Sequence, residues 1–224
     1  MLERVHVIGS GRAGGAITAR LRERGMTVTT GRQPDATAEL VILAVPDGKI
    51  AEVAERIEPG PWVAHVSGAT PLSALDPHRT RFSVHPLQTL TRERGAEQLD
   101  GAYAAVTAET DAAAFQADWL ARTLGLRPFP LADADRALYH AGAAIASNFL
   151  VTLYRTAARL FDEAGAPAEG LVPLMQRTID NGFQLTGPIA RGDWSTVEAH
   201  LEALRERVPD VEPLYRALAE ATKP

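Results

Sequence analysis

A glycine-rich run near the amino terminus has the residue types and spacing of a pyrophosphate-binding turn, and it reads Gly9, Ser10, Gly11, Arg12, Ala13 and Gly14. It directly follows the β-branched stretch Val5–Ile8 and opens a stretch with helical periodicity. In this context the first glycine makes a tight turn, the second lets backbone approach a pyrophosphate, and the third lets helix and strand pack closely. The helix amino terminus then faces the phosphates. The run predicts a dinucleotide site; the alternative is a glycine turn that binds nothing.

The residues after the second predicted strand distinguish between the two nicotinamide dinucleotides. An acidic side chain there would hydrogen-bond the ribose hydroxyl of NAD and repel the additional phosphate of NADP. Here Thr30 is followed by Gly31 and Arg32, and no carboxylate occurs before Asp35. The Arg32 guanidinium is a planar fork that suits a phosphate, and an ordinary surface arginine is the alternative. The sequence therefore favours NADP(H) over NAD(H).

Polar residues follow two further predicted strands, at the edge where open parallel sheets bind ligands. Ser67 and Gly68 come directly after one strand, while His85 ends the next and is followed closely by Gln88. We expect Ser67, His85 and Gln88 to converge on the nicotinamide, with Ser67 and Gly68 also contacting the cofactor. A simple turn residue is the alternative for Ser67, and a buried, hydrogen-bonded histidine before a turn proline is the alternative for His85.

A long helix expected in the carboxy-terminal part presents two distinct faces at about 100° per residue. The apolar face predicts a core stripe made of Leu138, Gly142, Ile145, Phe149, Leu153, Thr156 and Leu160. The opposite face contains His140, Ala144, Ser147, Asn148 and Val151. This second face is too mixed for a solvent surface and too polar for a core, so we expect it to line a cleft against the first domain. A helix–helix contact, such as a dimer interface, is the alternative.

Arg191 lies in a loop rich in glycine and proline, residues 186–193. Its guanidinium could bind a substrate carboxylate through a bidentate pair, and a plain surface loop is the alternative. The histidines and carboxylates show no spacing typical of zinc ligands, so no metal is expected.

The candidate residues require a sheet covered by helices to position them. Short β-branched runs predict strands at 5–8, 26–30, 40–45, 62–66, 81–85, 102–107 and 127–131. Amphipathic stretches predict helices at 12–24, 48–56 and 111–124 between them. This alternation is typical of a doubly wound, Rossmann-type α/β fold with a parallel sheet, in which Val45 and Pro46 would lie beside the cofactor ribose.

Alanine-rich helical sequence without strands follows residue 131. We therefore expect a cofactor-binding domain at residues 1–131 and a smaller, all-helical substrate and dimerisation domain at 132–224. Its first helix would begin at Asp133 or Asp135 and end at Gly165, and a second would span 168–184. Ser195 and Glu198 have the spacing of a capping box that opens a later helix.

Composition excludes several classes of protein. The formal net charge is −5 and the charges are interspersed, which argues against nucleic acid as a partner. There is no cysteine, which removes thiolate nucleophiles and cysteine metal sites. The apolar run 141–153 falls short of the ~20 residues of a membrane helix. No secretory leader precedes the first strand, so a cytoplasmic protein without membrane contacts is expected.

Six segments together resemble one known family over nearly the whole chain. They are the glycine run, Ala44-Val45-Pro46-Asp47, His65-Val66-Ser67-Gly68, His85-Pro86-Leu87-Gln88, the helix with Asn148, and the loop at 186–193. The chain resembles a family of Rossmann-type proteins with a carboxy-terminal helical domain of unknown function, in the 6-phosphogluconate dehydrogenase-like superfamily. The resemblance implies a homodimer, and it implies that some members serve as alternative ketopantoate reductases.

Two better-known relatives suggest roles for the polar residues. Ser67 and His85-Pro86 are similar to the serine and the catalytic His-Pro motif of prephenate dehydrogenases. Asn148 resembles the helical asparagine of ketopantoate reductases, which is preceded four residues earlier by a catalytic lysine. In this chain that position is Ala144, and the only lysines are Lys49 and Lys223. The usual proton donor is therefore missing.

These observations favour an NADPH-dependent reductase of a small carboxylated ketone, with ketopantoate as the best single substrate. The catalytic candidates are His85, Ser67, Asn148 and His140, and the substrate-binding candidates are Gln88, Ser147 and Arg191. Of these candidates only the histidines titrate near neutrality. His85 lies at a predicted strand end in a His-Pro context similar to that of prephenate dehydrogenases, whereas His140 lies on a helix of the other domain, so we expect His85, rather than His140, to supply the proton to the substrate oxygen. Imine reduction, a prephenate-like dehydrogenase and a non-catalytic NADP sensor are the alternatives.

Overall fold

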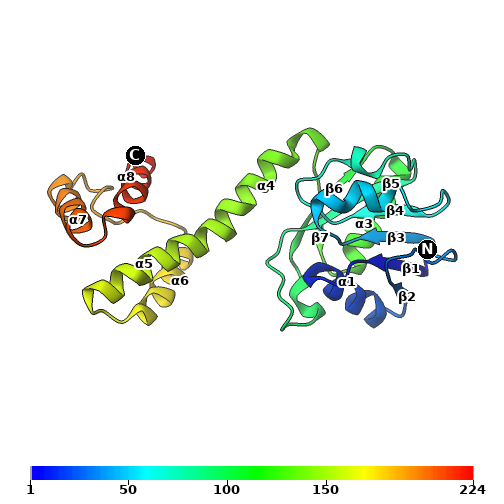
Figure 1. The fold of residues 1–224 in the computed structure, drawn as a ribbon, viewed down its shortest axis with the longest axis horizontal. Coiled ribbons are helices and arrows are strands. Elements are labelled where there is room, and N and C mark those ends of the chain that lie inside the picture. Colours follow the sequence, from blue (N-terminus) through cyan, green and yellow to red (C-terminus); the bar gives the residue numbers. More distant parts are fainter. Residues whose placement is uncertain (1, 224) are drawn as a thin grey trace. The chain divides into compact units, whose positions relative to one another are not determined.

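The computed structural model describes residues 2–223, which divide into two compact units, one ending at Ile145 and the other beginning at Ala146. The first unit contains a seven-stranded sheet with helices, and the second contains helices alone (Figure 1). The chain is therefore an α/β Rossmann-type protein with a helical carboxy-terminal region, as predicted. The predicted change to helical sequence at 131–132 precedes the division between the units, because the segment at 133–144 packs with the sheet unit.

The sheet has the strand order β2-β1-β3-β4-β5-β6-β7. Its strands are β1 Arg4–Ile8, β2 Thr27–Thr30, β3 Leu40–Leu43, β4 Trp62–His65, β5 Arg81–Pro86, β6 Tyr103–Ala108 and β7 Arg127–Pro130. Strands β1 to β5 are parallel, whereas β6 runs antiparallel to β5, and β7 is parallel to β6. At this edge the sheet departs from the predicted parallel arrangement, because the β5–β6 pair is antiparallel. Parallel neighbours need a crossover connection, and the segment between β5 and β6 contains only the 3₁₀ turn Ala96–Leu99.

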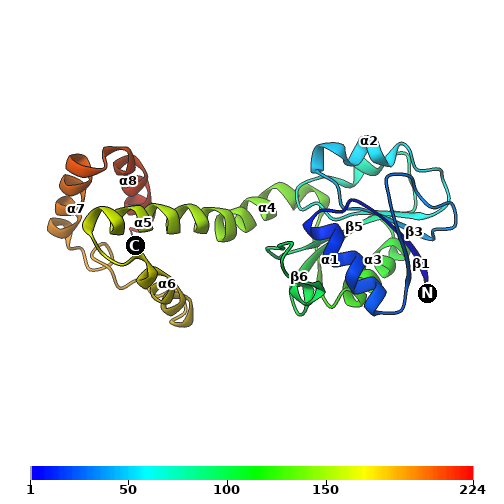
Figure 2. The ribbon, with the colours of Figure 1, turned by 60° about the horizontal axis from the view of Figure 1, so that its bottom comes forward.

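Two apolar cores lie on opposite faces of the sheet. On one face α1 (Arg12–Glu23) and α3 (Asp111–Thr123) bury residues such as Ile17, Leu21 and Leu120. On the other face α2 (Ile50–Ala54) packs with Leu72 and Leu75 (Figure 2). Strand β3 is covered on both faces, and all four of its residues are buried. Its uninterrupted apolar sequence reflects this central position.

The helices after the sheet are α4 Arg136–Ala144, α5 Leu150–Ala164, α6 Leu171–Asp180, α7 Trp194–Arg207 and α8 Glu212–Ala221. A π-helical turn, Ile145–Phe149, joins α4 to α5. Gly165 ends α5 with a left-handed φ of 71°, as the glycine stop signal predicted. The predicted capping box is displaced: α7 begins at Trp194, and its cap is Asp193, whose carboxylate accepts from the Thr196 backbone N–H.

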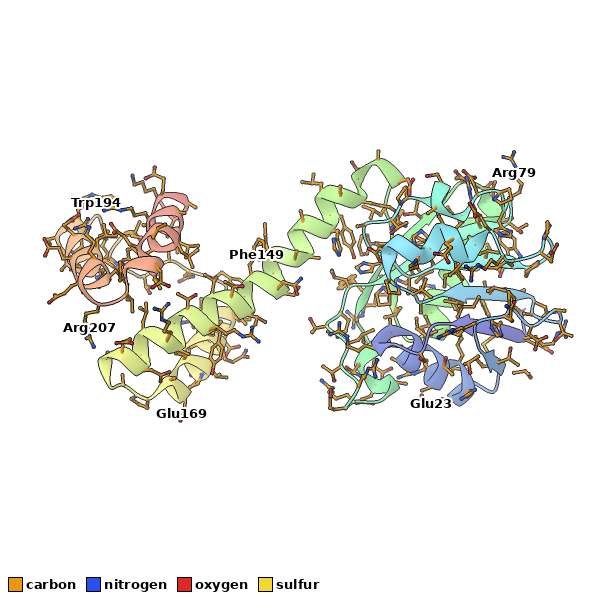
Figure 3. All side chains as sticks on the ribbon, in the orientation of Figure 1. Glu23, Arg79, Phe149, Glu169, Trp194 and Arg207 are labelled. Carbon is orange, nitrogen blue, oxygen red and sulfur yellow. The ribbon has the colours of Figure 1, made fainter. Side chains whose placement is uncertain are left out.

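The second unit has a small core in which Leu204, Val208 and Val211 pack against Leu160 and Tyr215. Of the predicted core stripe on the long helix, Leu160 packs against this core, but most of its large apolar side chains are not buried in the described chain. Leu138, Ile145, Phe149 and Leu153 are all exposed, and Phe149 is labelled in Figure 3. Their apolar pattern therefore reflects a surface that the rest of the described chain leaves uncovered.

Candidate functional site

The glycine turn between β1 and α1 is required by close packing. Gly9 has a φ of 119°, and a Cβ added there would lie 2.2 Å from the Ala44 carbonyl oxygen at the end of β3. A Cβ on Gly14 would lie 1.9 Å from the Gly9 carbonyl oxygen. By contrast, a Cβ on Gly11 would have no neighbour within 4 Å. The turn is therefore tight on its inner side and open at Gly11, which is the arrangement that lets backbone approach a pyrophosphate.

A cavity of about 940 Å³ extends from this turn along the carboxyl edge of the sheet. Its lining includes Gly9, Ser10, Gly14, Thr30 and Arg32. Val45 and Pro46 at the end of β3 also line it. The structure thus gathers these predicted cofactor residues around one cavity. Gly11, Arg12, Ala13, Ser67 and Gly68 are not part of its lining.

Cationic side chains outnumber carboxylates around this cavity. Arg22, Arg32, Lys49 and Arg56 line it together with a single acidic residue, Glu52. Glu52 forms ion pairs with Lys49 and Arg56, and the hydrogen bond from Lys49 is the largest cause of the lowered pKa of its carboxyl group. Arg32 makes no ion pair within residues 2–223, so its guanidinium remains available for an anion. These residues fit a phosphorylated dinucleotide.

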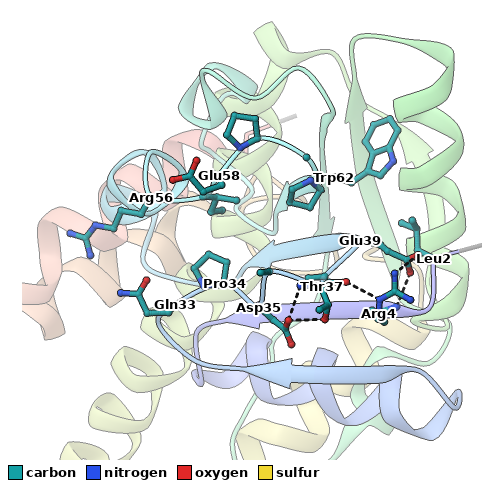
Figure 4. Close-up of a pocket in the computed structure, with 16 residues that line it drawn as sticks. Leu2, Arg4, Gln33, Pro34, Asp35, Thr37, Glu39, Arg56, Glu58 and Trp62 are labelled. Carbon is teal, nitrogen blue, oxygen red and sulfur yellow. Dashed lines mark hydrogen bonds and ion pairs between the residues drawn. The ribbon is translucent and has the colours of Figure 1, made fainter.

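A larger cavity, about 1130 Å³, is lined by residues before β1, β3 and β4 (Figure 4). Two of the three carboxylates that line it are engaged in holding the fold. Glu39 accepts hydrogen bonds from the Glu3 and Arg4 backbone N–H groups, and Asp35 accepts from Thr37. The cavity at the carboxyl edge, with its open glycine turn and unpaired arginine, is therefore the better candidate for a ligand site.

A cluster of aromatic side chains surrounds His85 at the end of β5. The His85 Nδ1 atom lies 2.8 Å from the Tyr139 hydroxyl, and the two rings meet edge to face with centroids 5.5 Å apart. The His140 ring lies 6.1 Å from that of His85. A Cβ added at Gly68 would come within 2.7 Å of His140 Cδ2 and 2.9 Å of His85 Nε2. The absence of a side chain at Gly68 therefore lets both histidines approach the loop after β4.

The Arg136 side chain lies next to this cluster and is only 1% exposed. Its guanidinium donates to the Ser67 carbonyl oxygen at 2.9 Å, to the Ser83 hydroxyl, and to Asp133 at 2.9 Å. Strands β4 and β5 are neighbours, so Arg136 ties the loop after β4 to the strand that carries His85. Burial lowers the pKa of the Arg136 guanidinium, while Asp133 raises it. The hydrogen bonds of the Arg136 guanidinium are therefore made within the fold.

Sequence reasoning missed both Arg136 and Tyr139. The available signal was their spacing with His140, because residues three and four apart share one face of a helix. Arg136, Tyr139 and His140 occupy such positions on α4.

Burial changes the chemistry expected of His85. Desolvation, followed by the charges of His140 and Arg136, lowers the His85 pKa to about 4, against a small opposing effect of Asp47. The expectation that His85 titrates near neutrality is therefore wrong, and its imidazole is neutral at pH 7. His65 is fully buried, and burial lowers its pKa to about 3.

The side chains of Ser67 and Gln88 are engaged in the fold. The Ser67 hydroxyl accepts from the Ala69 and Thr70 backbone N–H groups at 3.2 and 3.0 Å and donates to the Thr70 hydroxyl. This is the turn role left open for Ser67. Gln88 donates to the Gln98 carbonyl oxygen and accepts from the Thr89 N–H. Ser67 and Gln88 were expected to converge on the nicotinamide with His85, but both side chains bond within their own turn or loop. The hydrogen bond found for the His85 side chain is instead the one with Tyr139.

Three predicted site residues belong to the second unit. Ser147 and Asn148 lie in the π-helical turn, and Arg191 lies in the loop before α7, where it donates to the Thr186 carbonyl oxygen. Their roles stay predictions. Within residues 2–223, no helix is long and apolar enough to cross a membrane. No group of three or more His, Asp or Glu residues in the same range could hold a metal ion.

Two family models match the sequence. Residues 4–89 match a Rossmann-like domain, and residues 102–222 match a domain of unknown function, DUF2520. Comparison with curated protein sequences gives no match.

Solved structures share the fold over the whole chain. The candidate NADP oxidoreductase BF3122 from Bacteroides fragilis has 20% identity and a TM-score of 0.83, covering 98% of this chain and 97% of its own. Protein TM1727 from Thermotoga maritima has 23% identity and a TM-score of 0.77, with 97% and 96% covered. A reductive aminase from Aspergillus terreus, in complex with NADPH and ethyl-5-oxohexanoate, has 16% identity and a TM-score of 0.64, with 100% and 96% covered.

Proposed function

Because the chain belongs to the DUF2520 family and joins that domain to a Rossmann-like one, we propose that it is an NADPH-dependent reductase. The observation that carries this proposal is the single cavity shared by the open glycine turn and Arg32 at the carboxyl edge of the sheet. The similar structures support it, since BF3122 is a candidate NADP oxidoreductase and the reductive aminase is a complex with NADPH.

NADP(H), rather than NAD(H), is the proposed cofactor. The glycine turn would hold the pyrophosphate, and Arg32 would pair with the additional phosphate next to the adenosine ribose. Thr30, Val45 and Pro46 would contact the ribose groups. When bound, the reduced nicotinamide supplies a hydride.

The proposed substrate is a small carboxylated ketone, with ketopantoate as the best single candidate. His85 is the residue proposed to hydrogen-bond the substrate oxygen, because it lies near the carboxyl end of β5, with its Cε1 and Nε2 atoms close to Gly68 in the loop after β4. Asn148 and Ser147 are proposed to orient the substrate, and Arg191 to bind its carboxylate. Imine reduction is the second candidate, favoured by the shared fold of the Aspergillus terreus reductive aminase.

A substrate panel tests the reaction. The protein is incubated with NADPH and, in turn, with 2-oxo acids including ketopantoate, with imines and with cyclic ketones, while the absorbance of NADPH is followed. Oxidation with ketopantoate supports the first proposal, and oxidation only with imines supports the second. Tight NADPH binding with no oxidation across the panel would instead identify a cofactor sensor.

The helical region is proposed to form a homodimer and to contribute to substrate binding. Helix α5 buries none of its residues, and α6 buries only Leu171. Exposed apolar side chains on and after these helices include Val172, Leu174, Ile179 and Phe183. Amphipathic helices are stabilised mainly by covering their apolar face, so a second copy of this region is the proposed cover. A cytoplasmic location also stays a prediction.

A further inference from the structure

The hydrogen bond between His85 and Tyr139 joins residues 54 positions apart in the sequence. A neutral imidazole carries hydrogen on only one of its two nitrogens, and the partner of one nitrogen decides which. Tyr139 is half-buried, and its ring packs on His85 and on Phe129, with centroids 5.5 and 6.0 Å apart. The phenol is thus held on Nδ1 by packing as well as by the hydrogen bond.

We propose that Tyr139 donates its hydroxyl hydrogen to His85 Nδ1 and thereby fixes the hydrogen of the imidazole on Nε2, the atom that meets substrate. This assignment rests on the reductase function proposed above. It makes Tyr139 a positioning residue, because the phenol acts on substrate only through His85.

The surroundings of the pair favour this direction of donation. Burial raises the pKa of Tyr139, against a smaller opposing effect of Arg136, so the phenol keeps its hydrogen at neutral pH. Arg136 and His140 are the other basic groups whose charges act on His85, and Asp47 is the acidic one. Within residues 2–223, the side-chain hydrogen bond found for His85 is the one at Nδ1, so an N–H at Nε2 would be free to donate to a ligand.

The Tyr139–His85 pair also explains how an imidazole that is neutral at pH 7 can supply a proton to the substrate oxygen. As the carbonyl carbon receives hydride, the Nε2–H bond breaks and its proton forms an O–H bond with the substrate oxygen. The Tyr139 O–H bond breaks, and that proton forms a bond with Nδ1. The imidazole remains neutral, with its hydrogen now on Nδ1. The starting state is restored when Nε2 takes a proton from water and the Nδ1 hydrogen returns to the tyrosinate oxygen. A phenol can therefore replace the lysine that is missing at Ala144.

The chain contains a matched control for this pair. His200 Nδ1 lies 2.7 Å from the Tyr215 hydroxyl in the second unit, and their rings also meet edge to face, at 5.8 Å. The same substitution, tyrosine to phenylalanine, can thus be made at both positions. In each case the ring packing is kept and only the hydroxyl is removed.

The test is a ¹⁵N NMR measurement of the histidine tautomers in the full-length protein without added ligand, with His85 assigned through His85→Gln. We expect wild-type His85 to carry hydrogen on Nε2 across pH 6–8. Tyr139→Phe should shift its tautomer ratio towards Nδ1–H by about fivefold, the effect of one neutral hydrogen bond. Tyr215→Phe should leave the His85 signals unchanged and alter those of His200.

Two results would overturn the proposal. One is an Nδ1–H tautomer in the wild type, which would mean that His85 donates to Tyr139. The other is an unchanged His85 tautomer in Tyr139→Phe. Neither depends on turnover, so a separate titration with NADPH distinguishes failure of this proposal from failure of the reductase assignment.

Discussion

Replacing Arg136 by methionine should destabilise the sheet unit strongly. Methionine keeps much of the side-chain length but removes every donor. The Ser67 carbonyl and the Ser83 hydroxyl are buried and would each lose a donor, at roughly 1–3 kcal/mol each. Asp133 is 39% exposed and can recover water. The two buried groups that lose a donor together predict a loss of ~3–5 kcal/mol.

Urea and thermal unfolding followed by circular dichroism measure this loss. For a chain of this size, ~3–5 kcal/mol corresponds to a decrease in Tm of roughly 6–20 °C. Arg122→Met is the control, because the Arg122–Asp118 ion pair is exposed and screened by solvent and should contribute little to stability. A loss below about 1 kcal/mol for Arg136→Met would refute the bracing role of Arg136. The variant should also raise the pKa of His85, because the Arg136 charge is one cause of its lowering.

Three further predictions concern the cofactor, pH and assembly. Arg32→Ala should weaken NADPH binding by ~10- to 100-fold and leave NADH binding nearly unchanged. Titration of both cofactors measures this, and equal affinity of the wild type for NADPH and NADH would contradict the NADP assignment. The pKa values of His65 and His85 are lowered to about 3 and about 4 in the folded protein, whereas in the unfolded chain they return to ~6.5. Below pH ~6.5 the unfolded chain therefore binds more protons than the folded one. The free energy of unfolding should therefore decrease as pH falls from about 6.5 towards 4, and His85→Gln should flatten this dependence; an equally steep profile in that variant would count against a buried neutral His85. Light scattering should give twice 24.0 kDa for the wild type and a monomer for Leu174→Glu. Phe115→Glu on α3 changes an exposed apolar side chain outside the helical region and should stay dimeric. A monomeric wild type at micromolar concentration would rule the dimer out.

Local sequence patterns were sufficient for the fold class and for the glycine turn. Short apolar and β-branched runs predicted the seven strands, and the spacing of Gly9, Gly11 and Gly14 indicated which positions would be tightly packed and which open. These signals are readable because strand burial, tight turns and helix starts depend on neighbouring residues in the chain. The absence of a carboxylate before Asp35 is equally local.

Only the tertiary structure decided the environment of the candidate catalytic group. Tyr139 and Arg136 reach His85, Ser67 and Ser83 across 54, 69 and 53 residues of sequence, and no local pattern specifies those contacts. The pKa of His85 depends on burial and on charges brought close by folding, so its neutral state could not follow from residue type. The antiparallel direction of β6 likewise followed from the path of a long connection. Sequence patterns indicated candidate residues for the chemistry, and the packed structure determined the protonation and partners of His85, because both depend on distances between segments that are remote in the chain.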